Sequence, residues 1–245
     1  MSLVSPAIEV RGLTKRFGAV AALDRLDLAV ATGESLALFG PNGAGKTTLI
    51  RILTLGLRAT AGTFRIAGLD PARDDLGIRQ RIGLISHQSL LYDSLTAAEN
   101  LEFFARLYGV EQPRARAAQL LETLGLGHRV EDPVGHFSRG MQQRVSIARA
   151  LVHDPPLVLL DEPFSGLDPH AAGILRATLA GLRTRGRTVV LVTHNLRQGL
   201  ELSDRWILLS RGRLLGAGDS STADPLAFES EYFERLAADG LGGSR

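Results

Sequence analysis

Residues 35–53 decide the fold class of this chain, and they read Ser-Leu-Ala-Leu-Phe-Gly-Pro-Asn-Gly-Ala-Gly-Lys-Thr-Thr-Leu-Ile-Arg-Ile-Leu. The apolar run 35–39 is typical of a buried strand, and the run 49–53 is typical of a helix. Between them, residues 40–47 follow the pattern G-x-x-x-x-G-K-T. In that strand-to-helix context the pattern predicts a phosphate-binding loop, or P-loop.

The residue types in this loop suit an anion. Glycines let the backbone fold so that successive N–H groups point inward, and the helix N-terminus adds positive charge. Lys46 would reach the β- and γ-phosphates of a nucleotide, and the Thr47 hydroxyl would ligate Mg²⁺. A glycine-rich turn with a chance lysine is the alternative, but a second matching motif downstream argues against it. The predicted phosphate-binding residues are Gly40, Pro41, Asn42, Gly43, Ala44, Gly45, Lys46, Thr47 and Thr48.

Composition excludes several classes of protein. The chain has 245 residues, 44% of them hydrophobic, which is enough for a full core. A net charge of +2 without a dense basic run does not indicate a nucleic-acid-binding surface. The absence of cysteine excludes disulfides and thiolate metal sites. Because no apolar run is long enough to span a membrane and no signal peptide is visible, we expect a cytoplasmic protein.

The distribution of apolar residues predicts an α/β chain with a helical insertion at about 90–155. Apolar strands that alternate with helices favour a mostly parallel sheet covered on both faces. Strands are expected at 7–11, 26–30, 35–39, 63–66, 81–86, 157–160, 188–192 and 206–209. Helices are expected within 96–125, with a break near Gly109 and Pro113, and at 141–153, 170–185 and 196–202.

Two acids follow the strand predicted at residues 157–160. Ligands of parallel sheets bind beyond the carboxyl ends of the strands, so Asp161 should lie beside the P-loop and support Mg²⁺ there. Glu162 would face a different direction and could polarise a water molecule for attack on the γ-phosphate. The alternative is a solvated acid pair in a turn.

Residues 137–144, Phe-Ser-Arg-Gly-Met-Gln-Gln-Arg, lie shortly before that strand. A Ser followed by Gly at a helix start can cap the helix or present N–H groups to an anion. On these residues alone, capping is the better interpretation.

The order of these motifs resembles the ATP-binding cassette (ABC) family of transporter ATPases. The resemblance covers about residues 7–217 and rests on the P-loop, Gln88 after a strand, Ser-x-Gly-x-Gln at 138–142, Asp161-Glu162-Pro163, Ser165–Asp168 and Thr193-His194. It implies a P-loop NTPase core with a mostly parallel sheet, an N-terminal antiparallel β subdomain and an inserted α-helical subdomain. Residues 7–217 would form a single ATPase domain and residues 218–245 a short C-terminal helical tail.

In that family two cassettes pair head to tail around two ATP molecules. The resemblance implies that residues 40–48 bind phosphates in their own subunit, whereas Ser138 and Gly140 contact the γ-phosphate of the nucleotide held by the other. Gln88 would sense Mg²⁺ and the attacking water and couple to the membrane partner.

The remaining site residues are also implied by the resemblance. Asp161 would support the metal, Glu162 would be the catalytic base, and His194 would hold the γ-phosphate and the attacking water. Asp168 would make contact across the dimer, and Phe17 would stack on adenine.

This sequence departs from the commonest family pattern at three positions. Phe17 stands where Tyr is usual, which keeps an aromatic face for stacking. Arg139 and Met141 give Phe-Ser-Arg-Gly-Met where Leu-Ser-Gly-Gly-Gln is commonest. The same signature is similar to that of some bacterial haem-exporter cassettes of cytochrome c maturation, which makes haem one candidate cargo.

The other histidines show no metal-ligand spacing, and we interpret them as surface or loop residues. They are His87, His128, His136, His153 and His170.

The sequence therefore predicts an ATPase subunit that drives translocation through transmembrane permease subunits and works beside a second ATPase subunit, with ATP and Mg²⁺. It would sit on the inner face of the cell membrane through its partner, and no nucleic-acid partner is expected. One alternative is a non-transport ABC ATPase that acts on nucleic acid or the ribosome. A P-loop kinase or GTPase is another, although no Asn-Lys-x-Asp motif is present.

Overall fold

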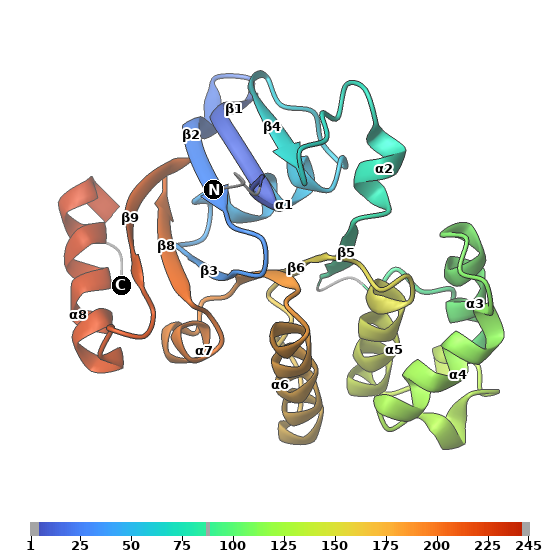
Figure 1. Cartoon of the computed structure of the whole chain (residues 1–245). Coiled ribbons are helices and arrows are strands. Elements are labelled where there is room, and N and C mark those ends of the chain that lie inside the picture. The colour runs from blue at the N-terminus through green and yellow to red at the C-terminus, as the bar shows by residue number, and fades with distance from the viewer. Residues whose placement is uncertain (1–4, 87–88, 242–245) are drawn as a thin grey trace.

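A six-stranded sheet forms the centre of the molecule (Figure 1). The computed structural model describes residues 5–86 and 89–241. The strand order in this sheet is β5-β6-β7-β3-β8-β9. These strands are β3 (Ser35–Phe39), β5 (Ile82–Ile85), β6 (Leu157–Asp161), β7 (Thr188–Val192), β8 (Arg205–Ser210) and β9 (Arg213–Asp219).

Every neighbouring pair in this sheet is parallel except β8 with β9. All residues of β3, β6 and β7 are buried, as the unbroken apolar runs in the sequence indicate. The predicted mostly parallel α/β core is confirmed. The edge strand β9 was not predicted; it is half-exposed, contains two glycines, and ends two residues beyond the expected boundary at 217.

A second sheet, antiparallel and three-stranded, has the order β2-β1-β4. Its strands are β1 (Ile8–Phe17), β2 (Val20–Val30) and β4 (Ala61–Ile66). The N-terminal antiparallel β subdomain is thereby confirmed. Both β1 and β2 extend beyond the predicted ranges, because register shifts between Val10 and Leu13 and again before Arg16 interrupt the alternation by which a strand is recognised.

Helices cover the central sheet and extend to one side of it (Figure 1). In the described residues they are α1 (Lys46–Leu53), α2 (Asp75–Arg79), α3 (Ala97–Leu107), α4 (Pro113–Thr123), α5 (Arg139–Leu151), α6 (Pro169–Thr184), α7 (Leu196–Glu201) and α8 (Pro225–Leu236). The predicted break within 96–125 is present, and Gly109 there has a positive φ of 72°. Helix α5 starts two residues before the predicted Met141 because Ser138 caps its N-terminus.

The apolar faces of α3, α4, α5 and α6 share one buried cluster with strands β5, β6 and β7. This cluster is separate from the one beneath the P-loop, which joins the antiparallel sheet to α1 and the central sheet. The helical insertion therefore packs on the opposite face of the central sheet from the antiparallel sheet.

His153 lies in the turn after α5, as the loop interpretation allows, but its side chain is half-buried. Its ring stacks on Tyr108 with centroids 3.9 Å apart, and its Nε2 lies 3.2 Å from the carbonyl oxygen of Ile82. Burial lowers the pKa of His153 to about 4, against the opposing effect of that hydrogen bond. His128, His136 and His170 are exposed as predicted, and His87 lies outside the described residues.

Helix α8 packs on the face of β3 and β8 through Phe228. Its ring lies 5.5 Å from that of Phe39 and 4.7 Å from that of Trp206, and Phe228 is only 3% exposed. Phe233, on the same helix, is 59% exposed.

Replacing Phe228 by alanine should lower the free energy of unfolding by about 3–5 kcal/mol, because it leaves a cavity between α8 and the sheet. Urea titration followed by circular dichroism measures this change. Phe233→Ala is the matched control and should cost less than about 1 kcal/mol. Equal losses in the two variants would contradict the packing described for α8.

Candidate nucleotide-binding site

The loop between β3 and α1 is held by close backbone contacts that require glycine. A Cβ on Gly40 would lie 2.2 Å from the carbonyl oxygen of Leu209, and one on Gly45 would lie 2.3 Å from that of Ala22. Gly40 has a φ of 148° and Gly45 a φ of 103°, values that L side chains rarely adopt. Two of the glycines that define the motif are thus fixed by packing as well as by backbone conformation.

Lys46 is buried at the start of α1 and points back into its own loop. Its Nζ donates to the carbonyl oxygens of Gly40, at 2.6 Å, and Pro41, at 2.9 Å. Burial lowers the pKa of Lys46, while the nearby charges of Glu162 and Asp161 raise it. An ammonium group so poorly hydrated gains more from a phosphate oxygen than an exposed lysine would.

A pocket of about 300 Å³ brings the predicted loop and the two acids together. Its lining residues are Ala22, Asn42, Gly43, Ala44, Gly45, Lys46, Thr47, Thr48, Asp161 and Glu162. Gly40 and Pro41 are not among them, but they hold Lys46 through their carbonyl groups. Ala22 was not predicted; it comes from β2, and nothing in its local sequence marks it.

The two acids stand where the parallel strands end. Asp161 is the last residue of β6 and is paired with Val192 of β7. Glu162 follows with a φ of 52°, and its N–H donates to the carbonyl oxygen of Val192 at 3.0 Å. Its Oε2 lies 2.8 Å from Nδ1 of His194, just beyond the end of β7. A positive φ is uncommon outside glycine, and here it turns the Glu162 side chain towards the pocket and His194.

The donor set also suits Mg²⁺. Thr47 and Asp161 line the same pocket and offer a hydroxyl and a carboxylate oxygen. Mg²⁺ is usually held by one or two carboxylates together with substrate phosphates and water. Within residues 5–86 and 89–241 no group of three or more His, Cys, Asp or Glu side chains could hold a metal by itself.

Ser138 and Gly140 lie away from this pocket, at the start of α5. The Ser138 Oγ accepts a hydrogen bond from the Met141 N–H at 3.3 Å, so the expected capping contact is present. Ser138 is exposed and Gly140 is buried. A Cβ on Gly140 would lie 3.1 Å from Oδ2 of Asp168, which itself caps α6 through the Ala171 N–H at 2.8 Å.

Phe17 and Gln88 complete the predicted set. Phe17 ends β1, is 50% exposed, and carries the Lys15 ammonium group 5.0 Å from its ring centroid. It does not line the phosphate pocket. Gln88 lies outside the described residues.

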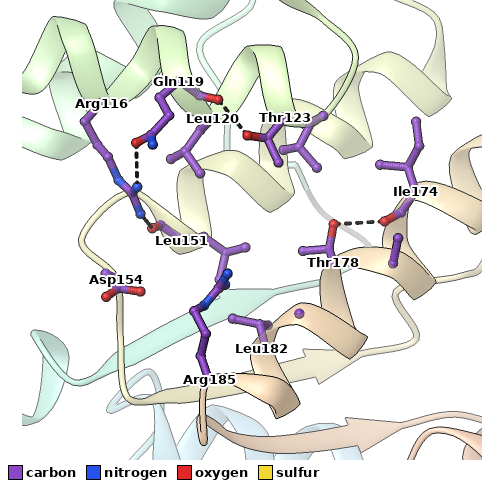
Figure 2. Close-up of a pocket in the computed structure, with 13 residues that line it drawn as sticks. Arg116, Gln119, Leu120, Thr123, Leu151, Asp154, Ile174, Thr178, Leu182 and Arg185 are labelled. Atoms are coloured by element: carbon purple, nitrogen blue, oxygen red, sulfur yellow. Dashed lines mark hydrogen bonds between the residues drawn. The ribbon is translucent and has the colours of Figure 1, made fainter.

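The described residues also form hollows outside this pocket. A larger one, of about 500 Å³, lies between α4 and α6 (Figure 2). Glu162 also lines a second cavity of about 130 Å³, which includes Arg139 and the loop residues Ser165, Gly166 and Leu167.

A family model described as "ABC transporter" matches residues 23–165. This chain belongs to the ABC transporter family. It is a cassette that binds and hydrolyses ATP. No helix among the described residues has the length and apolar character needed to cross a membrane.

Curated relatives of the cassette are ATP-binding proteins. It is 40% identical to the daunorubicin resistance ATP-binding protein DrrA3 of Streptomyces coeruleorubidus, over 93% of this chain and 72% of that protein. It is 38% identical to the Nod factor export ATP-binding protein I of Mesorhizobium japonicum, over 86% of this chain and 63% of that protein. The ABC transporter ATP-binding protein NatA of Bacillus subtilis is 36% identical, over 89% of this chain and 88% of that protein. These names do not support haem as the cargo, and they do not favour a non-transport role.

Solved cassettes share the fold. The ATP-binding subunit of an ABC transporter superimposes with a TM-score of 0.82 at 30% identity, over 97% of this chain and 95% of that chain. A dimeric cassette in a post-hydrolysis state, bound to ADP and phosphate, superimposes with a TM-score of 0.79 at 30% identity, over 87% and 98%.

Lys46→Ala should weaken ATP binding by about 10- to 150-fold, because charge-assisted hydrogen bonds are worth about 1.5–3 kcal/mol. Isothermal titration calorimetry with the non-hydrolysed analogue AMP-PNP measures the affinity. Arg51→Ala removes an exposed cation from the same helix and should leave it unchanged. An unaltered affinity in Lys46→Ala would contradict the phosphate role of this side chain.

Proposed function

We propose that the cassette drives export of an organic compound across a membrane, as one of two ATPase subunits attached to transmembrane permease subunits. The observation that carries the proposal is that Lys46 and Glu162 line one pocket of about 300 Å³. Ser138, which caps α5, is exposed outside this pocket. Export of an organic compound is suggested by relatives named for daunorubicin resistance and Nod factor export.

In this proposal residues 40–48 bind the phosphates of ATP, and Lys46 exchanges its contacts with the Gly40 and Pro41 carbonyls for phosphate oxygens. A Mg²⁺ ion held by Thr47 and Asp161, and sensed by Gln88, would neutralise charge on the phosphates. Phe17 is half-exposed and presents an aromatic face on which adenine can stack.

Glu162 acts as the catalytic base towards the attacking water. Its carboxylate is one-quarter exposed, which leaves room for water, and its other oxygen is oriented by the 2.8 Å contact with His194. His194 in turn is three-quarters exposed, so it can reach a γ-phosphate and the water that attacks it. The protein contributes chiefly position and charge, as is usual for phosphoryl transfer.

The second subunit supplies the groups that the pocket lacks. Ser138 and Gly140 do not line the pocket of their own chain, and Ser138 faces solvent, as a contact to another subunit's nucleotide requires. Asp168 lies beside Gly140 and would take part in the same interface. The dimeric arrangement of solved cassettes at 30% identity supports this model.

The permease would dock on α3 and the loop before it. Phe103 and Leu107 are 45% and 69% exposed there, and Tyr92, itself 50% exposed, packs edge-on against Phe103 with ring centroids 5.5 Å apart. Such a group of exposed apolar side chains is typical of a protein interface. It would place the cassette on the inner face of the membrane through its partner.

Glu162→Gln should lower kcat for ATP hydrolysis by about 10²- to 10⁴-fold, because an amide cannot accept the proton of the attacking water. ATP binding should persist, and the variant should accumulate as an ATP-dependent dimer in light scattering coupled to size-exclusion chromatography. The matched control is Glu201→Gln on α7, which should hydrolyse ATP at the original rate. Wild-type turnover by Glu162→Gln would remove this residue from the base role.

Affinity purification from gently solubilised native membranes tests the transport role. The tagged cassette should bring down a multi-span membrane protein, and the double variant Phe103→Asp, Leu107→Asp should lose it. Leu226→Asp, at a 78% exposed position on α8, is the control and should keep it. Recovery of ribosomal or nucleic-acid-bound proteins alone would favour the non-transport alternative.

A further inference from the structure

The outer edge of strand β5 is capped by side chains instead of by another strand. In the part of the chain that the structure describes, β5 is at the end of the six-stranded sheet and pairs only with β6. The Leu157 N–H donates to the carbonyl oxygen of Arg81 at 3.2 Å, so that carbonyl points towards β6. Successive carbonyls along a strand alternate in direction. Those of Ile82 and Leu84 therefore point away from β6, to the free edge.

Both of these edge carbonyls are bonded by one helix. Arg149 on α5 donates from Nη2 to the carbonyl oxygen of Leu84 at 2.9 Å. His153, just after α5, places Nε2 3.2 Å from the carbonyl oxygen of Ile82. Four residues of helix rise about 6 Å and two residues of strand about 6.6 Å. The spacing of the two side chains thus matches the spacing of the two carbonyls.

Helix α3 covers the outer side of this pair. The Tyr108 ring stacks on His153, with centroids 3.9 Å apart and planes 11° apart. The Arg149 guanidinium carbon lies 5.3 Å from the centroid of the Phe104 ring. Phe104 and Tyr108 are four residues apart at the end of α3, so one turn of α3 covers one turn of α5.

The protonation state of His153 fits this arrangement. Burial keeps the imidazole neutral at physiological pH, because its pKa lies near 4. To donate to the Ile82 carbonyl, Nε2 must carry the proton. The other ring nitrogen, Nδ1, is buried and has no hydrogen-bond partner among the described residues. The ring therefore acts as a single donor held flat between Tyr108 and the strand edge.

On the side opposite its free edge, β5 pairs with β6, the strand that ends at the two acids. Ile85 of β5 is paired with Leu160 of β6, and the next two residues after Leu160 are Asp161 and Glu162. A displacement of α3 can therefore reach these acids through Arg149, His153 and β5. Phe103 and Leu107, the proposed permease contacts, lie on the same helix as Phe104 and Tyr108.

We propose that Arg149 and His153 are positioning residues that tie α3 to the edge of β5, so that the position of α3 sets where β6 presents Asp161 and Glu162. This inference rests on the proposed role of Glu162 in hydrolysis. In this proposal α5 has a second role besides carrying the signature residues Ser138 and Gly140. It joins α3, the proposed docking helix, through β5 to β6, which ends at Asp161.

Paired kinetic and distance measurements on the isolated cassette test the proposal. The double variant Arg149→Met, His153→Leu removes both donors. We expect kcat, expressed per ATP-binding site measured by titration, to fall about 10- to 100-fold, since small displacements of catalytic groups cost that much. KM for ATP should change less than about twofold, because neither side chain contacts the phosphate pocket.

The absence of native cysteines allows a clean distance readout. Spin labels at Leu107→Cys on α3 and Ala180→Cys on α6 report the separation of α3 from the core. The distance distribution should be narrow in the parent and broader in the double variant. The milder pair Arg149→Lys, His153→Gln keeps a donor for each carbonyl and should restore most of kcat and a narrow distribution. If the double variant does not fold, the single variants Arg149→Met and His153→Leu replace it, and each should lower kcat and broaden the distribution.

Arg106→Met is the matched control. Arg106 is exposed on α3 and bonds Glu102 of the same helix, so its loss removes an arginine without touching β5 or the signature residues. It should leave kcat within about twofold of the parent. An unchanged kcat or an unchanged distance distribution in the double variant would overturn the proposal, as would an equal loss in Arg106→Met. Each of these results leaves the outcome for Glu162→Gln intact, so a failure of this inference is distinguishable from a failure of the proposed hydrolytic site.

Discussion

The close backbone approach of three segments around the P-loop is the constraint on which the nucleotide pocket depends. Gly40 packs against the carbonyl of Leu209, Gly45 packs against the carbonyl of Ala22, and Gly212 donates its N–H to the Ala44 carbonyl at 3.0 Å. A Cβ on Gly212 would lie 2.7 Å from the Ala22 carbonyl oxygen. Strand β2, the loop itself and the β8–β9 turn thus meet backbone to backbone, which only glycine permits.

This contact explains why the antiparallel sheet belongs to the site. Ala22 of β2 lines the phosphate pocket, and Phe17 stands at the end of the strand paired with it. The Asp24 N–H donates to the Gly212 carbonyl at 2.9 Å, which fixes β2 against the turn between β8 and β9. The sheet that presents Phe17 is therefore attached to the P-loop.

The side of the pocket that holds Asp161 and Glu162 depends on the register of the parallel strands. The pairing of Asp161 with Val192, and the bond from the Glu162 N–H to the Val192 carbonyl, place the ends of β6 and β7 level. Glu162 and His194 meet only because both follow these two ends. Strand β5 continues the same register on the other side of β6, and its free edge is held by α5 and α3. Asp161 and Glu162 thus lie between the P-loop core and the helical insertion.

The sequence by itself determined the P-loop, the acids after β6 and the α/β class, because each is a local pattern: glycines at fixed spacing, or an apolar run that ends in carboxylates. It also located the helices of the insertion, where Gly109 and Pro113 interrupt a helical period. Strands β1, β2 and β9 were partly or wholly missed, since bulges and glycines remove the alternation that marks a strand. The half-buried ring of His153 was not predicted, because a histidine after a helix carries no local sign of burial. Only the tertiary structure decided that its ring faces Tyr108 and the edge of β5, that Ala22 enters the pocket, and that Ser138 lies outside it. These are contacts between segments far apart in the chain, and their geometry is set by sheet register and helix packing, which no local pattern encodes.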